Sequence, residues 1–584
     1  MKVLTLDCQA TGANPDKGHL LEVGWLPTRA NTADRLLHTN LQAYLVRLPP
    51  EAGVPRVVER ITGIKAGFTE TAISTKKVWR RLRATAQEIT AGDPTAACPT
   101  VIHFARFERP FLKQLHQKNS PQEPFPFSII CTHEIALRLL PDLPRKGIRA
   151  LAGYFGHATP ELKRSGGHVV ATAYIWKKMV ELLSSTWGIS AIDQLVSWLD
   201  ETRPPGRSKR FFPMNPEIKH RLPNKPGVYR MLRTADGAPL YIGKAKSLQR
   251  RVNSYFRQKA PHAEHTLEML TQARELDITQ TGSALEAAIL ESDEIKRHCP
   301  PYNIALRRQQ RTLVFCTKDL CRYCADTDRK FPVGPLPGGR FIKALTAFGL
   351  WMSEGLKVDT EDQIYTVNSF LDLPDGYAPQ IDCVQQGANL FRKNYDSRVS
   401  QQSALRFLTT LGAKLWRERM ETIALADIEA EIENSNCDDE PEQKSSVEER
   451  VWTPEAIAHI IEGKVCHGAH MIRRTRWFCL LSESSLAWSS ADHHDHNKKL
   501  IVFKSGSVLE RKEIKAGGQI PIPPGYERSF QARQLDFNLM IYDRLRVLTT
   551  ELRRLVSENR NIELRLGPKV TLGPEEVMRA LRWV

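Results

Sequence analysis

One short segment near the middle of the 584-residue chain restricts its fold more than any other. Two strand-like runs, PGVYRMLRT and APLYIGKA, flank the dipeptide Asp236-Gly237, which is typical of a hairpin turn. A helix-like run, SLQRRVNSYF, and a third strand-like run, ELDITQT, follow. The run SALEAAILESDEIKRH then predicts a helix, because Ser283 and Glu286 have the spacing of a capping box. Together these elements predict a small α/β unit over 215–315.

Polar side chains suited to phosphodiester hydrolysis occur throughout this segment. In chain order they are Tyr229, Tyr241, Lys244, Arg251, Glu291 and Asn303. Such hydrolysis needs an activated nucleophile, neutralisation of developing negative charge and help for the leaving group. The guanidinium of Arg251 suits a phosphoryl oxygen, and Lys244 supplies further positive charge. Glu291 is a lone helix carboxylate, which suits a single Mg²⁺ or Mn²⁺ that keeps several waters.

Each of these residues taken alone also has an ordinary interpretation. Tyr229 and Tyr241 could be strand aromatics with a cross-strand contact, Arg251 part of a basic helix face, and Glu291 a solvated carboxylate. The complete set, present in order and at these spacings, favours the catalytic interpretation.

The series resembles the GIY-YIG nucleases, and among them the nuclease domain of UvrC and its short homologue Cho, over about residues 215–315. The resemblance implies that Tyr241 is the general base, Arg251 contacts the transition-state phosphate and Glu291 holds one Mg²⁺ or Mn²⁺. The supporting polar groups would be Tyr229, Lys244 and Asn303. By the same resemblance, the substrate is damaged double-stranded DNA, cut once on the 3′ side of a lesion in nucleotide excision repair, with a UvrB-like damage-recognition protein as partner.

The first 185 residues alternate strand-like and helix-like runs, which predicts a mixed α/β layer. The strand-like runs are Val3–Leu6, HLLEVGWLP, LQAYLVRLP and PTVIHFA, the last followed by a helix. Three motifs, DCQATG, HFARFE and HVVATA, resemble in order those of the DEDDh exonucleases, the family of DnaQ-type proofreading subunits. This resemblance implies a ribonuclease H-like exonuclease fold over 1–185.

The residues that bind metal in that exonuclease family are mostly changed here. Asp7 and the general-base histidine, His168, are kept, whereas a glutamate is replaced by Gln9, an aspartate by Glu108 and the last aspartate by Ala173. The family's chemistry uses two metal ions, whose mutual repulsion several carboxylates must offset. We therefore expect the fold without robust exonuclease activity. Strand-end geometry argues against Asp16 or Glu22 as replacement ligands, and strand pairing explains Glu22 better.

Three functions are compatible with these motifs. The leading hypothesis is a structure-specific DNA endonuclease of the UvrC/Cho type. The second is a non-catalytic DNA-binding or scaffold protein in which both nuclease folds have degenerated. The third is a dual nuclease that retains exonuclease activity through Asp7, Glu108 and His168.

The remainder of the chain carries weaker signals. We expect a Pro/Arg-rich connector over 186–214, a mainly helical region over 316–433, a flexible acidic linker over 434–450 and an α+β region of unknown role over 451–584. In the last region Trp477–Trp488 and Lys499–Lys504 look strand-like, and apolar residues from Phe537 to Leu555 have helical spacing. The whole chain is thus expected to be a multidomain α/β protein.

Three further clusters have two interpretations each. Cys316, Cys321 and Cys324 could begin a metal site, although reduced thiols are the simpler alternative. DHHDHNKK (492–499) resembles a metal cluster but is better explained as a solvated loop. RRQQR (307–311) could contact DNA phosphates or form a solvated basic turn.

Charge and apolar patterning bound the class of partner. Lys and Arg outnumber Asp and Glu by 83 to 66, which favours a polyanionic partner such as nucleic acid over a membrane. No apolar run long enough to cross a bilayer occurs, and the first residues lack the pattern of a signal peptide. The scattered cysteines favour a reducing compartment, so we expect a cytoplasmic protein.

Overall fold

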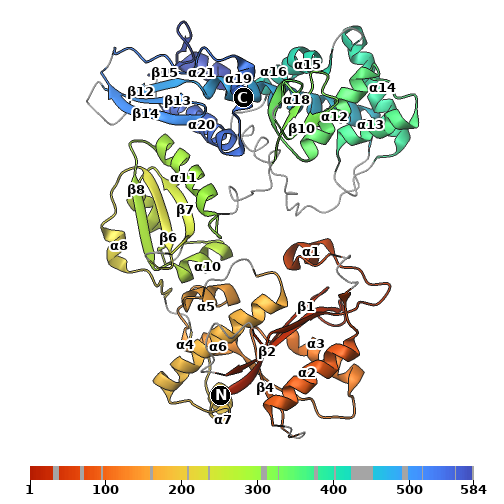
Figure 1. Cartoon of the computed structure of the whole chain (residues 1–584), viewed down its shortest axis with the longest axis vertical. Helices are drawn as coiled ribbons and strands as arrows, with labels where there is room; N and C mark the ends of the chain where they lie inside the picture. The colour runs from red at the N-terminus through yellow and green to blue at the C-terminus, as the bar shows by residue number, and fades with distance from the viewer. Residues whose placement is uncertain are drawn as a thin grey trace. The chain divides into compact units, whose positions relative to one another are not determined.

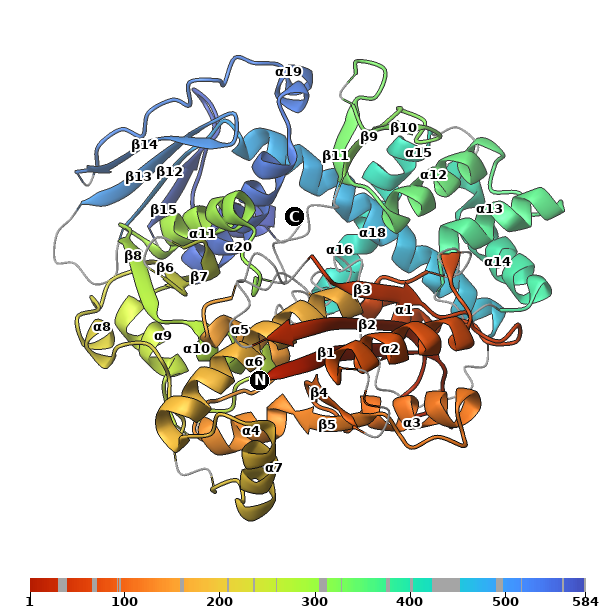
Figure 2. The same ribbon diagram turned by 60° about the horizontal axis from the view of Figure 1, so that its bottom comes forward.

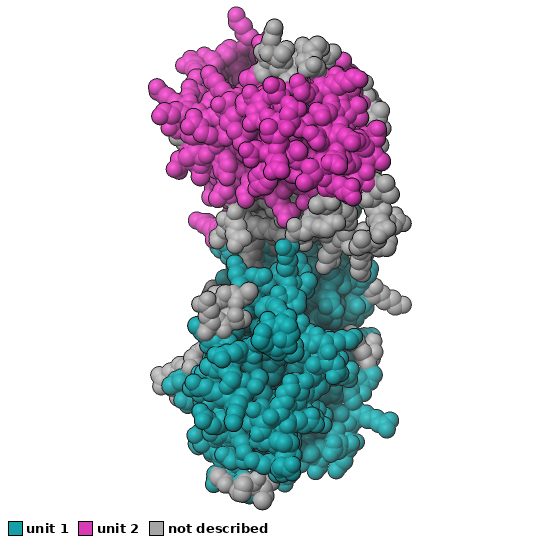
Figure 3. Space-filling view, turned by 90° about the vertical axis from the view of Figure 1, so that its right-hand side faces the viewer, with its two compact units in different colours: residues 1–287, 298–304 teal, residues 288–297, 305–584 magenta. Residues whose placement is uncertain are grey.

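The computed structural model describes residues 1–584 apart from 30–38, 66–70, 92, 94–95, 158–161, 207–208, 235–236, 259, 304–311, 327, 374–378, 400–402, 423–451, 490–496, 516, 559–560 and 582–584. The chain forms two compact units, which Figure 3 colours separately. Unit 1 comprises Met1–Ala287 and His298–Ile304, and unit 2 comprises Ala288–Arg297 and Ala305–Val584. Within the described ranges, no helix combines the length and the apolar character needed to pass through a membrane.

A five-stranded mixed sheet lies at the centre of the first part of unit 1 (Figure 1). Its strands are β1 (Lys2–Ala10), β2 (Leu20–Arg29), β3 (Gln42–Leu45), β4 (Cys98–Ile102) and β5 (Phe127–Cys131), in the order β3-β2-β1-β4-β5. The pairs β1–β2 and β2–β3 are antiparallel, whereas β1–β4 and β4–β5 are parallel. This arrangement is the ribonuclease H-like one, so the expected fold is confirmed.

Helices cover both faces of this sheet (Figure 2). Side chains alternate along β1, so Leu4 and Leu6 face one side and Val3 the other. The first side packs on α2 (Thr75–Ile89) and α3 (Glu108–Asn119). The second side packs on α4 (Thr132–Leu139), α5 (Ile148–Tyr154), α6 (Ser165–Trp187) and α7 (Ile192–Glu201). The remaining helix of this part is α1 (Arg56–Thr62).

Helix α7 lies within the range 186–214, which was expected to be a connector. Its residues Leu195 and Trp198 are buried in the same core as β1 and α6. This stretch therefore extends the first domain before the chain enters the next one.

A three-stranded antiparallel sheet forms the second part of unit 1. Its strands are β6 (Gly227–Leu232), β7 (Pro239–Ala245) and β8 (Glu275–Gln280), in the order β7-β6-β8. The helices are α8 (Pro216–His220), α9 (Leu248–Tyr255) and α10 (Glu264–Gln272). The predicted hairpin is confirmed, although Asp236 of its turn lies outside the described residues. Ser247 caps α9 by accepting a hydrogen bond of 3.2 Å from the Arg250 backbone N–H.

Helix α11 (Ala284–His298) is the helix predicted from its capping box. The Ser283 hydroxyl accepts a hydrogen bond from the Glu286 backbone N–H at 3.2 Å and donates one to the Glu286 carboxylate at 3.0 Å. Glu286 thus binds the Ser283 hydroxyl through both its carboxylate and its backbone N–H. Residues Ala288–Arg297 of this helix cluster with unit 2.

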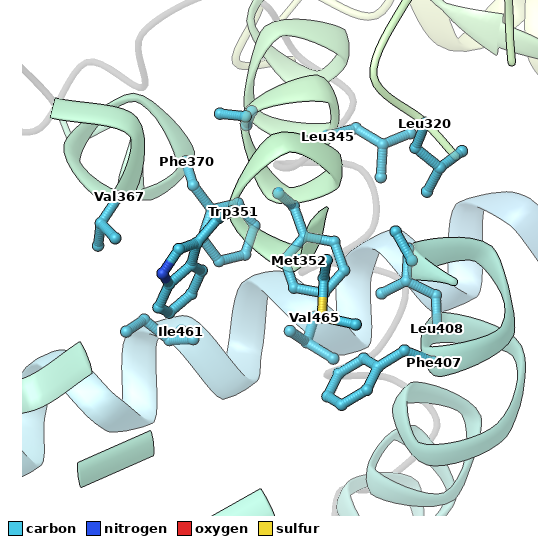
Figure 4. Packing of buried hydrophobic residues seen from close by; sticks show 14 of the residues in the cluster. Leu320, Leu345, Trp351, Met352, Val367, Phe370, Phe407, Leu408, Ile461 and Val465 are labelled. Carbon is cyan, nitrogen blue, oxygen red and sulfur yellow. The ribbon is translucent and has the colours of Figure 1, made fainter. Parts of the chain in front are cut away.

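Unit 2 begins with a small sheet and a helical bundle. The strands are β9 (Leu313–Cys316), β10 (Tyr323–Cys324) and β11 (Val333–Pro337), in the order β10-β9-β11. The helices are α12 (Arg340–Ser353), α13 (Glu361–Leu371), α14 (Ile381–Val399), α15 (Ala404–Phe407), the π-helix η3 (Leu408–Gly412), α16 (Ala413–Thr422) and α18 (Pro454–Leu481). A single apolar core joins sheet and bundle, with Trp351, Phe370, Phe407 and Ile461 at its centre (Figure 4).

The last part of unit 2 is a five-stranded sheet with helices. Its strands are β12 (Ser485–Ser489), β13 (Lys498–Lys504), β14 (Ser507–Ile514), β15 (Ile562–Arg565) and β16 (Thr571–Leu572), and its helices are α19 (Phe530–Leu535), α20 (Leu539–Glu558) and α21 (Pro574–Leu581). The long helix predicted from the Phe537–Leu555 stripe is confirmed as α20, although it begins at Leu539, after Phe537. The strand predicted to begin at Trp477 is wrong, because α18 continues to Leu481 and its Phe478 and Cys479 are fully buried.

The stretch of α11 that clusters with unit 2 is held there by ion pairs. Asp293 pairs with Arg544 at 3.0 Å, and Lys296 pairs with Asp543 at 2.7 Å. Lys296 also donates a hydrogen bond of 3.3 Å to the Leu539 carbonyl. Helix α11 is therefore fastened to α20 on the side that carries these residues.

Candidate active site

Three tyrosines meet on the small sheet of unit 1. The hairpin sets Tyr229 on β6 beside Tyr241 on β7, since Tyr229 lies opposite Gly243 and Met231 lies opposite Tyr241. Tyr255, at the end of α9, completes the group. The ring centroids are 6.1 Å apart for Tyr229–Tyr241, 6.1 Å for Tyr229–Tyr255 and 6.5 Å for Tyr241–Tyr255. The hydroxyls of Tyr229 and Tyr255 share a hydrogen bond of 2.9 Å.

The tyrosines differ in burial, and therefore in what they can do. Tyr229 is fully buried, and this burial, together with the neighbouring Tyr255 and Tyr241, raises its pKa well above the usual value. Tyr229 is thus a neutral hydrogen-bonding group at physiological pH. Tyr241 is only half-buried, so it is the tyrosine of the hairpin pair that a substrate can reach.

Gly243 allows the hairpin tyrosines to lie against the backbone. A Cβ at this position would lie 2.4 Å from the Tyr229 hydroxyl oxygen and 2.8 Å from Cε1 of Tyr241. Neither ring could then keep its place. The glycine of the second motif is therefore a steric requirement for the tyrosine pair.

Arg251 supplies positive charge beside the tyrosines. It lies four residues before Tyr255 on α9, so the two share a helix face. Its guanidinium carbon is 5.2 Å from the centroid of the Tyr255 ring, although the side chain as a whole is exposed. Desolvation lowers the pKa of Arg251, but the neighbouring phenols of Tyr229 and Tyr255 outweigh it, and the net direction is upward. Arg251 is therefore permanently cationic and accessible.

Asn303 and Lys244 occupy supporting positions. The Asn303 amide is buried and binds both backbone groups of Ile242, accepting from its N–H at 2.9 Å and donating to its C=O at 2.7 Å. Asn303 thus holds β7 directly beside Tyr241. Lys244 lies on the same strand, opposite Val228, and is half-buried.

A cavity of about 360 Å³ opens beside the tyrosines. Its lining includes Tyr241, Arg251, Tyr255, His262, His265 and Tyr302. The cavity therefore combines a half-buried phenol with a permanent cation, the pairing that proton removal beside a phosphate requires.

Glu291, the predicted metal ligand, lies on α11 in the stretch Ala288–Arg297 that belongs to unit 2. It is half-exposed. The nearby Glu286 is bound to the helix cap through Ser283. A half-exposed carboxylate offers the hard oxygen donors that Mg²⁺ prefers while leaving room for its waters, so the donor chemistry fits such an ion.

The exonuclease-like site has a different character, because its remaining polar groups bind one another. Asp7 accepts from His168, with 3.2 Å between Oδ1 and Nδ1, and from the Gln9 amide at 3.4 Å. Burial lowers the pKa of His168, but the Asp7 carboxylate, the Leu162 carbonyl and Glu22 together raise it on balance, while burial raises the pKa of Asp7 itself. The two residues retained from the motif are thus paired with each other.

Glu22 is held by a second internal cation. Its carboxylate accepts from Arg164, with 3.0 Å to Nε, and from the Ser165 backbone N–H at 2.8 Å. Its backbone pairs with Gln9 on β1, as expected. Asp16 is exposed in the loop that follows β1. Both Glu22 oxygens therefore have donors within the domain.

Glu108 and Ala173 complete this site. Glu108 is buried, and its burial and the proximity of Asp7 raise its pKa to about 9. Among the described residues, its Oε2 has no hydrogen-bond partner. Ala173 is fully buried against Leu26 and Val170. A buried carboxyl with a raised pKa and a methyl group thus occupy two positions at which the sequence resemblance predicts metal-binding carboxylates.

The weaker metal candidates gain no support. In the part of the chain that the structure describes, no group of three or more His, Cys, Asp or Glu residues is placed to hold a metal ion. Cys316, Cys321 and Cys324 are free thiols, with Cys316 and Cys324 on the paired strands β9 and β10, and the possible metal site there stays a prediction. Most of DHHDHNKK and all of RRQQR lie outside the described residues.

Sequence reasoning missed four of the cavity residues named above, Tyr255, His262, His265 and Tyr302. Tyr255 had a usable signal, because its spacing of four from Arg251 predicts a shared helix face. His262 and His265 had none, since they come from the turn before α10 and from α10 itself, and only the fold brings these to the tyrosines.

Comparison with known proteins agrees with this geometry. Residues 225–304 match the family model of the UvrC-like GIY-YIG domain. A UvrABC system protein C from Psychrobacter sp. is 45% identical over 106 residues, which is 18% of this chain and 17% of that protein. A putative bifunctional exonuclease/endonuclease protein from Mycobacterium tuberculosis is 28% identical over 256 residues, which is 44% of this chain and 37% of that protein. The chain thus spans well under half the length of these relatives.

A solved structure is also similar to the same segment. The GIY-YIG N-terminal endonuclease domain of UvrC from Thermotoga maritima, bound to magnesium as its catalytic divalent cation, is 36% identical and is covered completely by 16% of this chain, with a TM-score of 0.14. Residues 225–304 are a UvrC-like GIY-YIG domain, and the domain before it has an exonuclease-like fold.

Proposed function

We propose that the chain is a metal-dependent DNA endonuclease of nucleotide excision repair that hydrolyses one phosphodiester. The observation that carries the proposal is the cluster of Tyr229, Tyr241 and Tyr255 with Arg251 beside a cavity of about 360 Å³. This cluster lies within the segment that matches a UvrC-like GIY-YIG domain. Such a set can remove a proton from water and neutralise a phosphate in one place.

Each residue has a distinct role in the proposed reaction. Tyr241 takes the proton of the attacking water as a phenolate, the form that the positive charge of Arg251 and Lys244 favours. Arg251 contacts the phosphoryl oxygens, on which negative charge develops in the transition state. Tyr229, neutral and hydrogen-bonded to Tyr255, keeps the tyrosine group in place. Asn303 fixes the strand that carries Tyr241.

Glu291 is the proposed ligand of one Mg²⁺ or Mn²⁺. When bound, such an ion stabilises charge on a phosphoryl oxygen and lowers the pKa of a coordinated water. One carboxylate suffices for an ion that keeps several waters.

The proposed substrate is damaged double-stranded DNA, cut on the 3′ side of the lesion. The net charge of +17 suits a polyanion. Selection by lesion rather than by base sequence suits a site that binds backbone and shape. A UvrB-like damage-recognition protein is the proposed partner.

The exonuclease-like domain is proposed to act as a scaffold without exonuclease activity. Its retained Asp7 is paired with His168, its Glu22 with Arg164, and Ala173 offers no oxygen donor. Two closely spaced metal ions need several free carboxylates, which this set does not supply.

A cleavage assay on end-labelled, lesion-bearing duplex DNA tests the proposal, with Mg²⁺ or Mn²⁺ and with or without UvrB. We expect an internal nick that is lost in Tyr241→Phe and Glu291→Ala and retained in Asp7→Ala. Tyr365→Phe is a matched control, since Tyr365 is a 75% exposed tyrosine on α13.

The same assay separates the competing functions. Degradation from 3′ ends that disappears in Asp7→Ala would show a working exonuclease. Binding of the duplex without cleavage in the presence of either metal ion would indicate a scaffold protein and contradict the endonuclease proposal.

A further inference from the structure

The exonuclease-like domain touches the helix that forms one wall of the nuclease cavity. Both domains belong to unit 1. Arg145, just before α5, pairs with Glu264 of α10 at 2.6 Å, and its backbone N–H donates to the Thr271 hydroxyl at 3.2 Å. On the other side of α5, Arg274 donates a hydrogen bond of 2.7 Å to the Tyr154 carbonyl. Contacts from both ends of α5 thus fix it along α10.

Arg149 stands at the centre of this contact. Its guanidinium lies 3.3 Å from the Glu268 carboxylate and 5.1 Å from the centroid of the Tyr302 ring. Tyr302 in turn donates a hydrogen bond of 2.6 Å to Glu268 and accepts one from the Gln272 amide. The side chains of Arg149 and Glu268 are about three-quarters buried, at 25% and 23% exposure. Partial burial makes this ion pair stronger than an exposed surface pair.

The two domains pack without a gap at this point. A Cβ added to Gly153 of α5 would lie 1.9 Å from Oε1 of Gln272. Gln272 is 1% exposed, and its Oε1 accepts a hydrogen bond of 2.8 Å from Arg233. A loose, adaptable contact would tolerate one methyl group here, whereas this one requires glycine.

The contact continues from Tyr302 to β7, the strand that carries Tyr241. Tyr302 lines the cavity, and its backbone N–H donates to the Leu240 carbonyl at 3.1 Å. The next residue, Asn303, binds both backbone groups of Ile242. These two attachments lie on either side of Tyr241. A shift of Tyr302 therefore moves the strand that carries the proposed general base.

We propose that the exonuclease-like domain is a brace of the nuclease cavity, and that Arg149 is a positioning residue that acts through Glu268 and Tyr302. The inference rests on the proposed function for its catalytic consequence, but the mechanical contact is independent of it. It also assigns a use to a domain that has lost most of its metal-binding carboxylates: the fold is retained because its α5 holds the neighbouring site.

The test compares full-length variants in two readouts. Arg149→Ala is expected to lower kcat for nicking about 10-fold with a change in KM for DNA of less than about twofold, because the site is displaced while the DNA-binding surface stays. Amide hydrogen exchange at Ile242 and Tyr302 is expected to become faster. Arg149→Lys, which keeps the charge, should recover part of both effects.

Arg83→Ala is the matched control. Arg83 also forms an arginine–glutamate pair in the exonuclease-like domain, with 2.8 Å between its Nη1 and Glu123, but on α2 and away from α5. It should leave kcat and both amides unchanged. If Arg149→Ala yields no folded protein, Glu268→Gln removes the same charge pair and is measured instead.

The outcomes separate the brace from the proposed function. Unchanged exchange at Ile242 and Tyr302 in Arg149→Ala overturns the brace, whatever the activity. Faster exchange with unchanged kcat overturns the positioning role. If Tyr241→Phe still nicks DNA, the proposed function fails on its own, and hydrogen exchange alone then decides whether the brace exists.

Discussion

The two nuclease-like sites of unit 1 treat their polar residues in opposite ways. In the tyrosine site, Tyr241 and Arg251 line a cavity and face what enters it. In the exonuclease-like site, Asp7 is bound to His168 and Glu22 to Arg164, so charge is neutralised within the protein. The positive charge of Arg251 can therefore act on a substrate. In the exonuclease-like site, by contrast, the charged groups act mainly on each other.

The apolar core of the exonuclease-like domain and the positions expected to bind metal involve different residues. The core of this domain is apolar on both faces of its sheet. Stability scales with the area of apolar surface buried, whereas catalysis depends on a few oxygen atoms. Gln9 and Ala173 can therefore stand in place of expected ligands without cost to this core, and the proposed lack of exonuclease activity needs no loss of structure.

The largest expected effect comes from removing the cation of the tyrosine site. Arg251→Ala should lower kcat for nicking about 10²–10³-fold, because charge developing on the phosphate then has no guanidinium beside it. Single-turnover cleavage measures this effect. Arg250→Ala, one residue earlier on the same helix and also exposed, should change the rate less than about threefold. Equal losses in both variants would mean that Arg251 contributes only general electrostatic attraction to DNA. The contrast drawn between the two sites would then be wrong.

A second variant tests whether the exonuclease-like site can still bind a metal ion. Ala173→Asp places a carboxylate among Leu26, Val169 and Val170, and should destabilise the domain by about 3 kcal/mol. The melting temperature measures the loss, and Ala84→Asp on the exposed face of α2 is its control. We expect Mg²⁺ and Mn²⁺ not to restore stability. Recovery with either ion would mean that the site still gathers metal ligands.

A third variant tests the packing of the tyrosine pair. Gly243→Ala puts a methyl group 2.4 Å from the Tyr229 hydroxyl and should cost about 1–3 kcal/mol, with loss of nicking as the rings separate. Gly53→Ala is the control, because a Cβ there meets nothing within 4 Å. Thermal melting and cleavage are measured on the same samples. Full activity in Gly243→Ala would show that the tyrosine geometry is not needed.

The smallest effect concerns the buried carboxyl of the exonuclease-like site. Because the pKa of Glu108 is raised to about 9 from a usual 4.5, the folded protein keeps a proton that the unfolded chain releases between these values. Its contribution to stability therefore falls as pH rises through this window. Glu108→Gln, which needs no proton, should raise stability by about 1 kcal/mol at pH 8 and by less at pH 5. A gain that is equal at both pH values would contradict the raised pKa.

Local features of both domains could be predicted from the sequence. The hairpin of β6 and β7 and the cap at Ser283 follow from short-range patterns, whereas the fold of the first domain was implied by the resemblance of its motifs to the DEDDh exonucleases. The structure confirms all three. Prediction failed at Trp477, where apolar residues read as a strand continue the buried helix α18. A short apolar run has no period that distinguishes a buried strand from a buried helix.

The sequence by itself determined which candidate site residues are present. These are a tyrosine pair, an arginine and a helix glutamate at the spacings of GIY-YIG nucleases, and a second set of motifs without most of its carboxylates. Only the tertiary structure decided which residues meet. It brought Tyr255 to Tyr229, Arg164 to Glu22 and Arg149 to Tyr302. The physical reason is separation along the chain. Capping and strand alternation act between near neighbours, whereas these contacts join residues 26, 142 and 153 positions apart. Only the packing of the folded domains brings such residues together.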